Sequence, residues 1–190
     1  NARIGVLPIK GIVAGVEYGG MELIRDFLIE GLMDKNFQAE RLDLTANVGD
    51  DRFWAMMKQP ESIRKKIMSH KLAKGYELYV FPSISSSFAS MKGNLVRWDG
   101  VSYRMKSTGG RPDGWRGRTS VYSLALDVCD GHGRWLFTSH GGVLIPHSIN
   151  IVTGVFKFRD DLLEGKRDIK NIKKGVKAAL HPLVKGKYKA

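Results

Sequence analysis

The stretch RIGVLPIKGIVAGVEYGGMELIRDFLIEGLMDKNFQAERLDL, residues 3–44, decides the fold class of this chain. Residues 3–10 are mostly apolar, partly β-branched and followed by glycine, which predicts a buried first strand. In residues 21–35 the apolar side chains recur at helical spacing, and residues 37–44 alternate as a second strand should. Strand, helix and strand in this order predict a right-handed crossover between two parallel strands.

The next part of the chain continues this pattern. A short helix is predicted over residues 52–59, and Pro60 begins a longer helix that ends at Gly75. Residues 76–83 are apolar nearly throughout, which predicts a third strand at the centre of the sheet.

After residue 83 the pattern becomes antiparallel. Ser85–Ser87 are interpreted as a break, and residues 95–105 alternate around an Asp99-Gly100 turn signal. A strong strand at residues 119–129 is followed by a hairpin partner at residues 134–140. Gly141 and Gly142 then predict a bend, because glycine tolerates sharp backbone angles.

The end of the chain is helical and basic. Residues 158–163 are expected to open a helical stretch, and residues 167–180 show helical spacing up to Pro182. We therefore expect one α/β domain, residues 1–190, with a mixed sheet of about five strands, packed helices, and a basic C-terminal helix and tail. The sheet is parallel in its first part and contains an antiparallel hairpin later. The expected core consists of Ile4, Val6, Leu7, Leu28, Leu78, Val80, Leu124, Leu126 and Val176.

Composition excludes several classes of protein. With 43% hydrophobic and 26% charged residues, the chain has ordinary globular usage rather than that of a disordered or collagen-like protein. No run of 18 apolar residues is present, so no membrane-spanning segment is predicted. The net charge of +12 favours acidic partners, nucleic acid or anionic lipid. Cys129 is the only cysteine, which excludes an internal disulfide.

The motifs that resemble catalytic ones are incomplete. Gly15 and Gly20 have the spacing of a phosphate-binding loop, but Met21 and Glu22 stand where the loop needs lysine and a hydroxyl. His140-Gly141-Gly142 resembles part of an esterase oxyanion loop, yet no G-x-S-x-G pentapeptide accompanies it. Ser62 and Lys65 form an S-x-x-K without the other motifs of that enzyme class. We therefore expect no enzymatic activity and no cofactor.

His132, His140 and His147 are the clustered histidines of the chain. Zinc sites need three or four ligands in compact geometry, and these three follow one another at irregular gaps. Asp127 and Asp130 could complete a site only by an accident of the hairpin. Turn chemistry explains Asp130 and its glycines without a metal, so we expect none.

The most distinctive stretch runs from Lys92 to Arg118. It holds seven basic residues against two acidic ones, with Trp98, Tyr103 and Trp115 between them. Arginine beside aromatic residues is typical both of protein hot spots and of single-strand nucleic-acid surfaces. The simpler alternative is a hairpin whose aromatic residues pack inward and whose arginines are only solvated. The predicted partner-binding residues, expected on one exposed side, are Arg97, Trp98, Arg104, Arg111, Trp115, Arg116 and Arg118.

Four segments resemble one known group of proteins. They are RIGVLPIKG (3–11), GYELYVFPSIS (75–85), SLALDVCDGHGRWLFTSHGG (123–142) and NIKKGVKAALHPLV (171–184). Their order resembles the α/β domain of the TolB amino-terminal domain, CsgG and related small periplasmic lipoproteins. Asp130, Gly133 and Trp135 match the hairpin that ends the sheet in that group. The basic stretch between Lys92 and Arg118 is longer than in the group.

The resemblance implies an exported protein that is not an enzyme. It implies an outer-membrane-anchored periplasmic lipoprotein that acts in envelope assembly through contacts with envelope proteins. The lipidated cysteine is expected to precede Asn1. The alternative function is a nucleic-acid-binding module that uses the basic-aromatic stretch, and an enzyme ranks last. Oligomerisation stays open.

Overall fold

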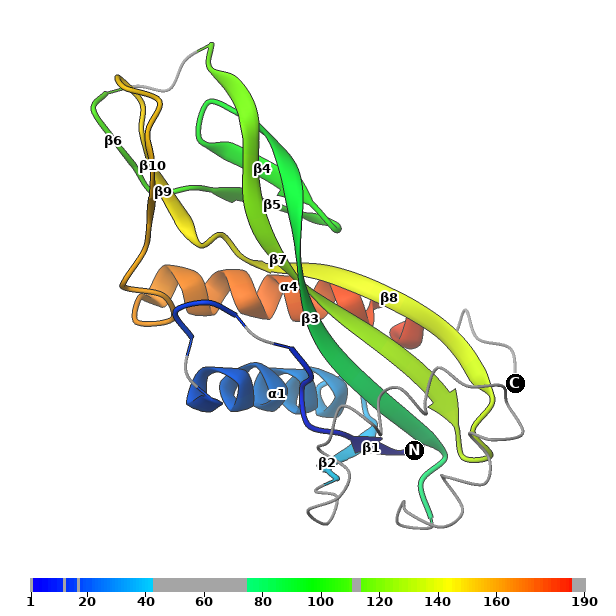
Figure 1. Ribbon diagram of the computed structural model, residues 1–190. Helices are drawn as coiled ribbons and strands as arrows, with labels where there is room; N and C mark the ends of the chain where they lie inside the picture. Colours follow the sequence, from blue (N-terminus) through cyan, green and yellow to red (C-terminus); the bar gives the residue numbers. More distant parts are fainter. Residues whose placement is uncertain (1, 12, 17, 43–74, 111–113, 186–190) are drawn as a thin grey trace.

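The computed structural model describes residues 2–11, 13–16, 18–42, 75–110 and 114–185 (Figure 1). The helices predicted over residues 52–59 and 60–75 lie almost entirely outside the described residues.

The first unit of the fold is the predicted crossover. Strand β1 (Arg3–Val6) is followed by helix α1 (Tyr18–Met33) and strand β2 (Gln38–Arg41), which pairs in parallel with β1. Asn36 adopts a positive φ of 63° after α1, as a residue that ends a helix often does. Strand β3 (Leu78–Lys92) lies parallel to β1 on its other side, so β1 is flanked on both edges.

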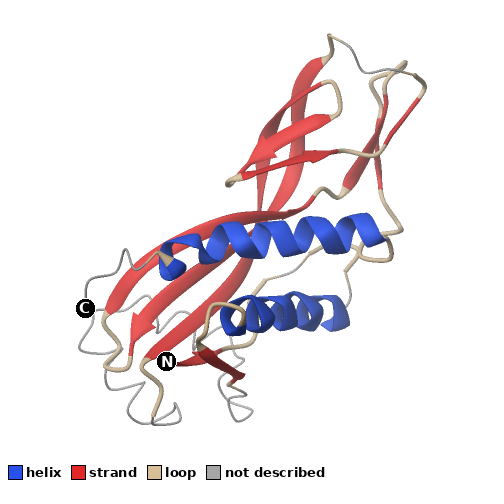
Figure 2. Cartoon of the chain, turned by 180° about the vertical axis from the view of Figure 1, so that it is seen from behind, coloured by secondary structure: helices blue, strands red, loops and turns tan. Residues whose placement is uncertain are grey.

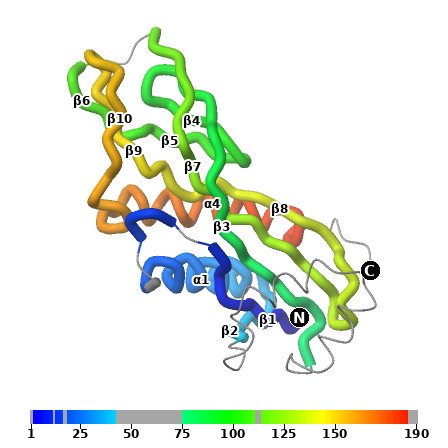
Figure 3. The backbone as a smooth tube through the Cα atoms, in the orientation of Figure 1, coloured from blue at the N-terminus to red at the C-terminus, as the bar shows by residue number. Residues whose placement is uncertain are grey.

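Two long strands form the spine of the molecule. Strand β3 pairs antiparallel with β7 (Arg116–Asp130) over the full 15 residues of both strands. The hairpin partner of β7 is β8 (Trp135–Leu144). At the start of β3 the strand order is therefore β2-β1-β3-β7-β8. Figure 3 shows both long strands continuing past helix α4 (Lys166–Val184) into a second part of the molecule.

That second part consists of strands alone. The end of β3 pairs with β4 (Leu95–Trp98), and β4 forms a hairpin with β5 (Val101–Arg104). Asp99 and Gly100 both have positive φ, as the two-residue turn of a tight hairpin requires. A small sheet of β6 (Ser107–Thr108), β9 (His147–Asn150) and β10 (Phe156–Phe158) lies beside this hairpin (Figure 1).

Among the described residues, two clusters of buried apolar side chains lie on the same long strands. In the proximal half, α1 and α4 (Lys166–Val184) cover one face of the sheet, and Leu28, Val80 and Val176 lie between the layers (Figure 2). In the distal half, Val96, Tyr103 and Val121 pack against Ile149 of the small sheet. We call these two parts the proximal half and the distal half.

Helix α4 lies unusually close to β8. A Cβ atom added to Gly175 would lie 2.1 Å from the carbonyl oxygen of Gly142, and one added to Gly141 would lie 1.9 Å from that of Gly175. Only glycine permits this backbone approach. Gly141 and Gly142 are therefore strand residues, and the register of β8 against β7 shifts directly after Gly142, where the bend was expected.

The α/β class, the mixed sheet of about five strands and the antiparallel hairpin are confirmed, and all nine expected core residues are buried. Ser85–Ser87 do not break β3, because they are exposed strand residues whose hydroxyls remain in water. Residues 158–163 are not helical, since Leu163 has a φ of 69°. Pro182 lies within α4, whose last turn closes when Lys185 N–H donates to the His181 carbonyl.

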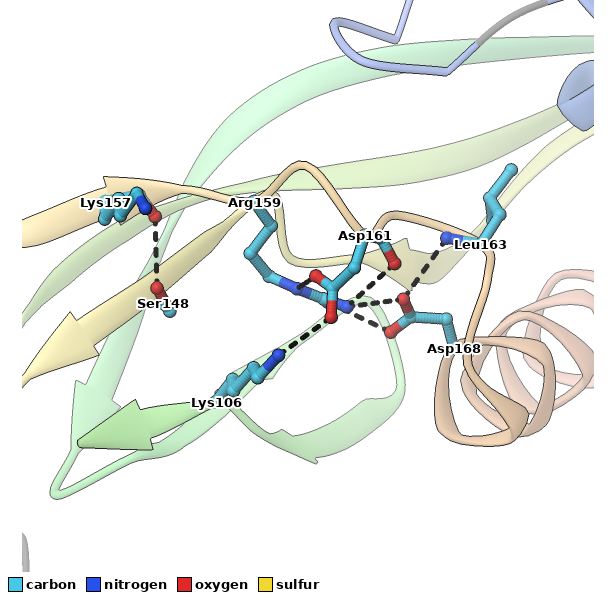
Figure 4. Close-up of polar contacts among 7 residues, drawn as sticks. All are labelled: Lys106, Ser148, Lys157, Arg159, Asp161, Leu163 and Asp168. Atoms are coloured by element: carbon cyan, nitrogen blue, oxygen red, sulfur yellow. Dashed lines mark hydrogen bonds and ion pairs between the residues drawn. The ribbon is translucent and has the colours of Figure 1, made fainter.

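A polar network joins the small sheet to the start of α4 (Figure 4). Arg159 donates to Asp168 at 2.7 Å and to Asp161 at 2.8 Å, and Lys106 donates to Asp161 at 2.8 Å. Hydrogen bonds from Lys106 and then Arg159 lower the pKa of Asp161 to about 2. Asp168 is buried in the first turn of α4, where its charge suits the helix dipole. The network therefore fixes the distal half to α4.

Candidate interaction surface

The strand register places the predicted arginines on one face. Ser90 of β3 lies opposite both Arg97 of β4 and Arg118 of β7. Residues directly opposite one another on paired strands point to the same side of a sheet. By the same rule Lys92 shares that side with Arg116, and Leu95 shares it with Arg104. We call the exposed basic residues Lys92, Arg97, Arg104, Arg116 and Arg118 the basic face.

No carboxylate opposes these charges on the strands. From Phe88 onward, the positions of β3, β4, β5 and β7 that share this side carry serine, leucine, lysine, arginine and phenylalanine. Within the described part of the chain, no residue of the basic face forms an ion pair. The surface is therefore a patch of uncompensated positive charge on regular strands.

Phe88 adds an aromatic ring to the basic face. Its side chain is 68% exposed, and the guanidinium of Arg118 lies 5.7 Å from the ring centroid. Phenylalanine and arginine are both enriched at protein interfaces relative to the rest of the surface.

The predicted tryptophans lie on the other side of the same strands, contrary to expectation. Trp98 packs edge-on against Tyr103 with 5.1 Å between ring centroids, and its indole N–H donates to the Tyr122 carbonyl at 3.3 Å. Trp115 lies 6.1 Å from the ring of Phe156. Both are half-buried against the distal core, because strand alternation turns them away from their arginine neighbours.

Two members of the surface were missed, and one predicted member is not described. Arg111 lies outside the described residues. The predicted partner-binding residues do not include Lys92 or Phe88, because the sequence predicts a third strand over residues 76–83 and a break at Ser85–Ser87. The signal was present in the alternation of Phe88, Ser90 and Lys92 with the apolar Ala89 and Met91.

The histidines do not converge. His132 lies in an exposed turn, His140 on β8, and His147 on β9 against Phe158. Burial lowers the pKa of His147. The backbone N–H groups of His132 and Arg134 both donate to the Asp130 carboxylate at 2.9 Å, so this carboxylate stabilises the turn that it belongs to. Among the described residues, no group of three metal-binding side chains is present.

Comparisons with known proteins found little. No protein-family model matches the chain, and no curated protein matches it. Among solved structures, the chain is similar to a Helicobacter pylori protein assigned as a neuraminyllactose-binding hemagglutinin homolog, with 10% identity and a TM-score of 0.39. The match covers 97% of this chain and 82% of the other. No helix within the described segments is long and apolar enough to span a membrane.

Proposed function

We propose that this chain is a non-enzymatic binding protein that captures an acidic protein partner on its basic face. The observation that carries the proposal is a row of exposed, unpaired basic residues on regular strands, with Phe88 exposed beside them and no carboxylate among them. Positive potential without internal compensation attracts an acidic surface and raises the rate of encounter.

The support beneath the basic face favours binding. Its arginines stand on paired strands whose opposite side packs in the distal core, so the backbone is ordered before a partner arrives. A preordered surface loses less conformational entropy on association. Arg118 and Phe88 are already in contact, and arginine is one of the residue types that dominate interface energetics, while phenylalanine is enriched at interfaces.

The cellular setting of the proposal rests on the sequence resemblance to the TolB and CsgG group. On that basis the partner is an envelope protein, and the chain is part of a periplasmic lipoprotein of the outer membrane.

Nucleic-acid binding is the alternative, and the positions of the aromatic residues weigh against it. Single-strand binding needs several exposed rings on which successive bases stack. Here Trp98, Tyr103 and Trp115 point into the distal core, and Phe88 is the aromatic residue left on the basic face. The charge alone would still give weak, salt-sensitive binding to nucleic acid.

The test is a triple variant, Arg97→Ala, Arg116→Ala and Arg118→Ala, compared with Lys166→Ala, Lys170→Ala and Lys185→Ala. Both variants lose three exposed positive charges, but only the first loses them from the basic face. We expect the first variant to lose capture of acidic envelope proteins in a cross-linking pull-down, while the second retains it. Equal capture by both would contradict the proposal.

A titration with single-stranded oligonucleotide at two salt concentrations distinguishes the alternative. Nucleic-acid binding through the basic face predicts a log K that falls by about 0.7 per phosphate contacted for each tenfold rise in salt. Tight binding at physiological salt, lost in the basic-face variant, would replace the protein partner by nucleic acid.

A further inference from the structure

A second positively charged site lies on α4, away from the basic face. It is a cleft of about 810 Å³ between α4, β8 and the β4–β5 hairpin. The residues that line it and matter here are Lys174, Lys177, His181, His140, Ser102 and Val101. We call it the α4–β8 cleft. None of the basic-face residues lines it.

The walls of the α4–β8 cleft are held together by hydrogen bonds between its three elements. The Tyr103 hydroxyl lies 3.0 Å from the Gly142 carbonyl and also contacts the Asn171 carbonyl of α4. The Ser139 hydroxyl donates to the Ala179 carbonyl at 2.6 Å. These contacts join β5 to β8 and β8 to α4. The cleft is thus a preformed feature of the fold.

The charge of the cleft has one sign. Lys174, Lys177 and His181 are spaced i, i+3 and i+7, which places them along one stripe of α4. His140 is added from β8. Among the described residues that line the cleft there is no Asp or Glu. Four nitrogen-bearing side chains from two elements therefore line one volume whose own lining has no carboxylate, and two of them, Lys177 and His181, also border the groove that holds Glu30 and Asp34.

The nitrogen donors of the cleft suit a phosphate. Lysine binds phosphate as a point charge, and no arginine lines the α4–β8 cleft to supply the planar fork that recognises carboxylate and phosphate bidentately. Ammonium and imidazole groups are point donors, which suit the several oxygens of a tetrahedral phosphate. Val101 and Ala178 add an apolar wall against which an organic group can pack. The volume is in the range of sites for small organic ligands.

We propose that the α4–β8 cleft binds a phosphate-bearing ligand, held by Lys174, Lys177, His181 and His140. The same chemistry is offered by a free phosphate compound and by the headgroup of an anionic phospholipid. The proposal is independent of the function assigned to the basic face.

The substitutions that test the α4–β8 cleft must leave the neighbouring groove between α1 and α4 unchanged. Lys177 and His181 also border the groove between α1 and α4, where Glu30 and Asp34 lie, whereas Lys174 and His140 line the α4–β8 cleft and not that groove. The test variant is therefore Lys174→Ala with His140→Ala. The matched control is Lys170→Ala with His132→Ala, which removes the same residue types from the same helix and the same β7–β8 hairpin outside the cleft.

The experiment is calorimetric titration of the full chain with inorganic pyrophosphate. We expect saturable binding that weakens at least about tenfold in the test variant and stays within about twofold in the control, because only the former loses donors to the anion. Binding that does not saturate, or that weakens equally in both variants, overturns the proposal. Circular dichroism of both variants verifies that the exposed substitutions leave the fold intact.

Sedimentation with vesicles that contain phosphatidylglycerol separates the two sources of phosphate. Vesicle binding that is lost in the test variant assigns the lipid headgroup as ligand. Unchanged vesicle binding, together with loss of pyrophosphate binding, assigns a free phosphate compound. The variant Arg97→Ala, Arg116→Ala and Arg118→Ala should bind pyrophosphate normally. This result would separate the proposal for the α4–β8 cleft from the proposal for the basic face.

Discussion

The proximal and distal halves are built on the same two strands, yet the same side of those strands has opposite roles in them. Along β3, Val80 and Ile84 face the helices and are buried in the proximal core. Phe88 and Lys92 belong to the same alternating series and are exposed in the distal half. Strand alternation defines two sides, but the elements packed on each side decide which one is the interior.

The largest effect should come from the contact that joins helix and sheet in the proximal half. Gly175→Ala places a Cβ atom 2.1 Å from the Gly142 carbonyl oxygen, so α4 must move away from β8. We expect a loss of about 3 kcal/mol in the free energy of unfolding, measured by urea denaturation.

The control for this contact is the same substitution in the other helix. Around Gly19 of α1 no atom lies within 4 Å of an added Cβ. Gly19→Ala should leave stability unchanged or raise it by up to about 1 kcal/mol. If both variants had the same free energy of unfolding, the close approach of α4 and β8 would not contribute to the effect of a substitution at Gly175.

A matched pair of substitutions on β3 tests directly whether one side of this strand is interior in the proximal half and exterior in the distal half. Ile84→Ser removes a buried side chain and should cost about 3 kcal/mol, because it leaves a cavity and buries a hydroxyl. Phe88→Ser, four residues along the same side, should change stability by less than about 0.5 kcal/mol. Thermal unfolding of both variants is the measurement. A comparable loss at Phe88 would place it in a core rather than on a surface.

The smallest effect concerns the network between the halves. Since the pKa of Asp161 falls from 3.8 to about 2 on folding, its charged form stabilises the fold above about pH 4. This contribution is lost as the pH falls towards 2. The carboxylate is 37% exposed, so solvent screening limits the change to about 1 kcal/mol. Unfolding measured at about pH 5 and about pH 2 should show it.

Two variants isolate this pH dependence. Asp161→Asn should remove the difference attributed to the network, because the amide does not titrate. Asp160→Asn, an exposed neighbour, should retain it. An unchanged pH profile in Asp161→Asn would assign the acid sensitivity to other carboxylates.

The sequence predicted the parts of the fold that depend on local periodicity. The crossover at residues 3–44, the Asp99-Gly100 hairpin and the final helix follow from spacing and turn residues, and the structure has all three. It could not predict that Gly141 and Gly142 remain in β8, because their partner Gly175 lies more than thirty residues away in the chain. Close approach of two backbones is a tertiary property without a local signature.

The candidate surface, like the fold, could be predicted from the sequence only in part. The concentration of arginine was evident from composition, and the register gathers Arg97, Arg104, Arg116 and Arg118 on one side. The positions of Trp98 and Trp115 depend on strand alternation, which the composition of the segment as a whole does not give residue by residue. The α4–β8 cleft could not be predicted at all, because His140 and Lys174 meet only when α4 packs on β8.

The length over which β3 and β7 are paired also determines where the protein can be attached to a support without blocking the basic face. Ile4 lies opposite Leu78 at one end of the spine, whereas Lys92 and Arg116 lie at the other (Figure 1). At about 3.3 Å per residue, the two ends are separated by about 45 Å. A tag or surface linkage at the start of β1 would therefore leave the basic face unobstructed and far from the support. A label inserted in the β4–β5 turn, next to Arg97, would obstruct it.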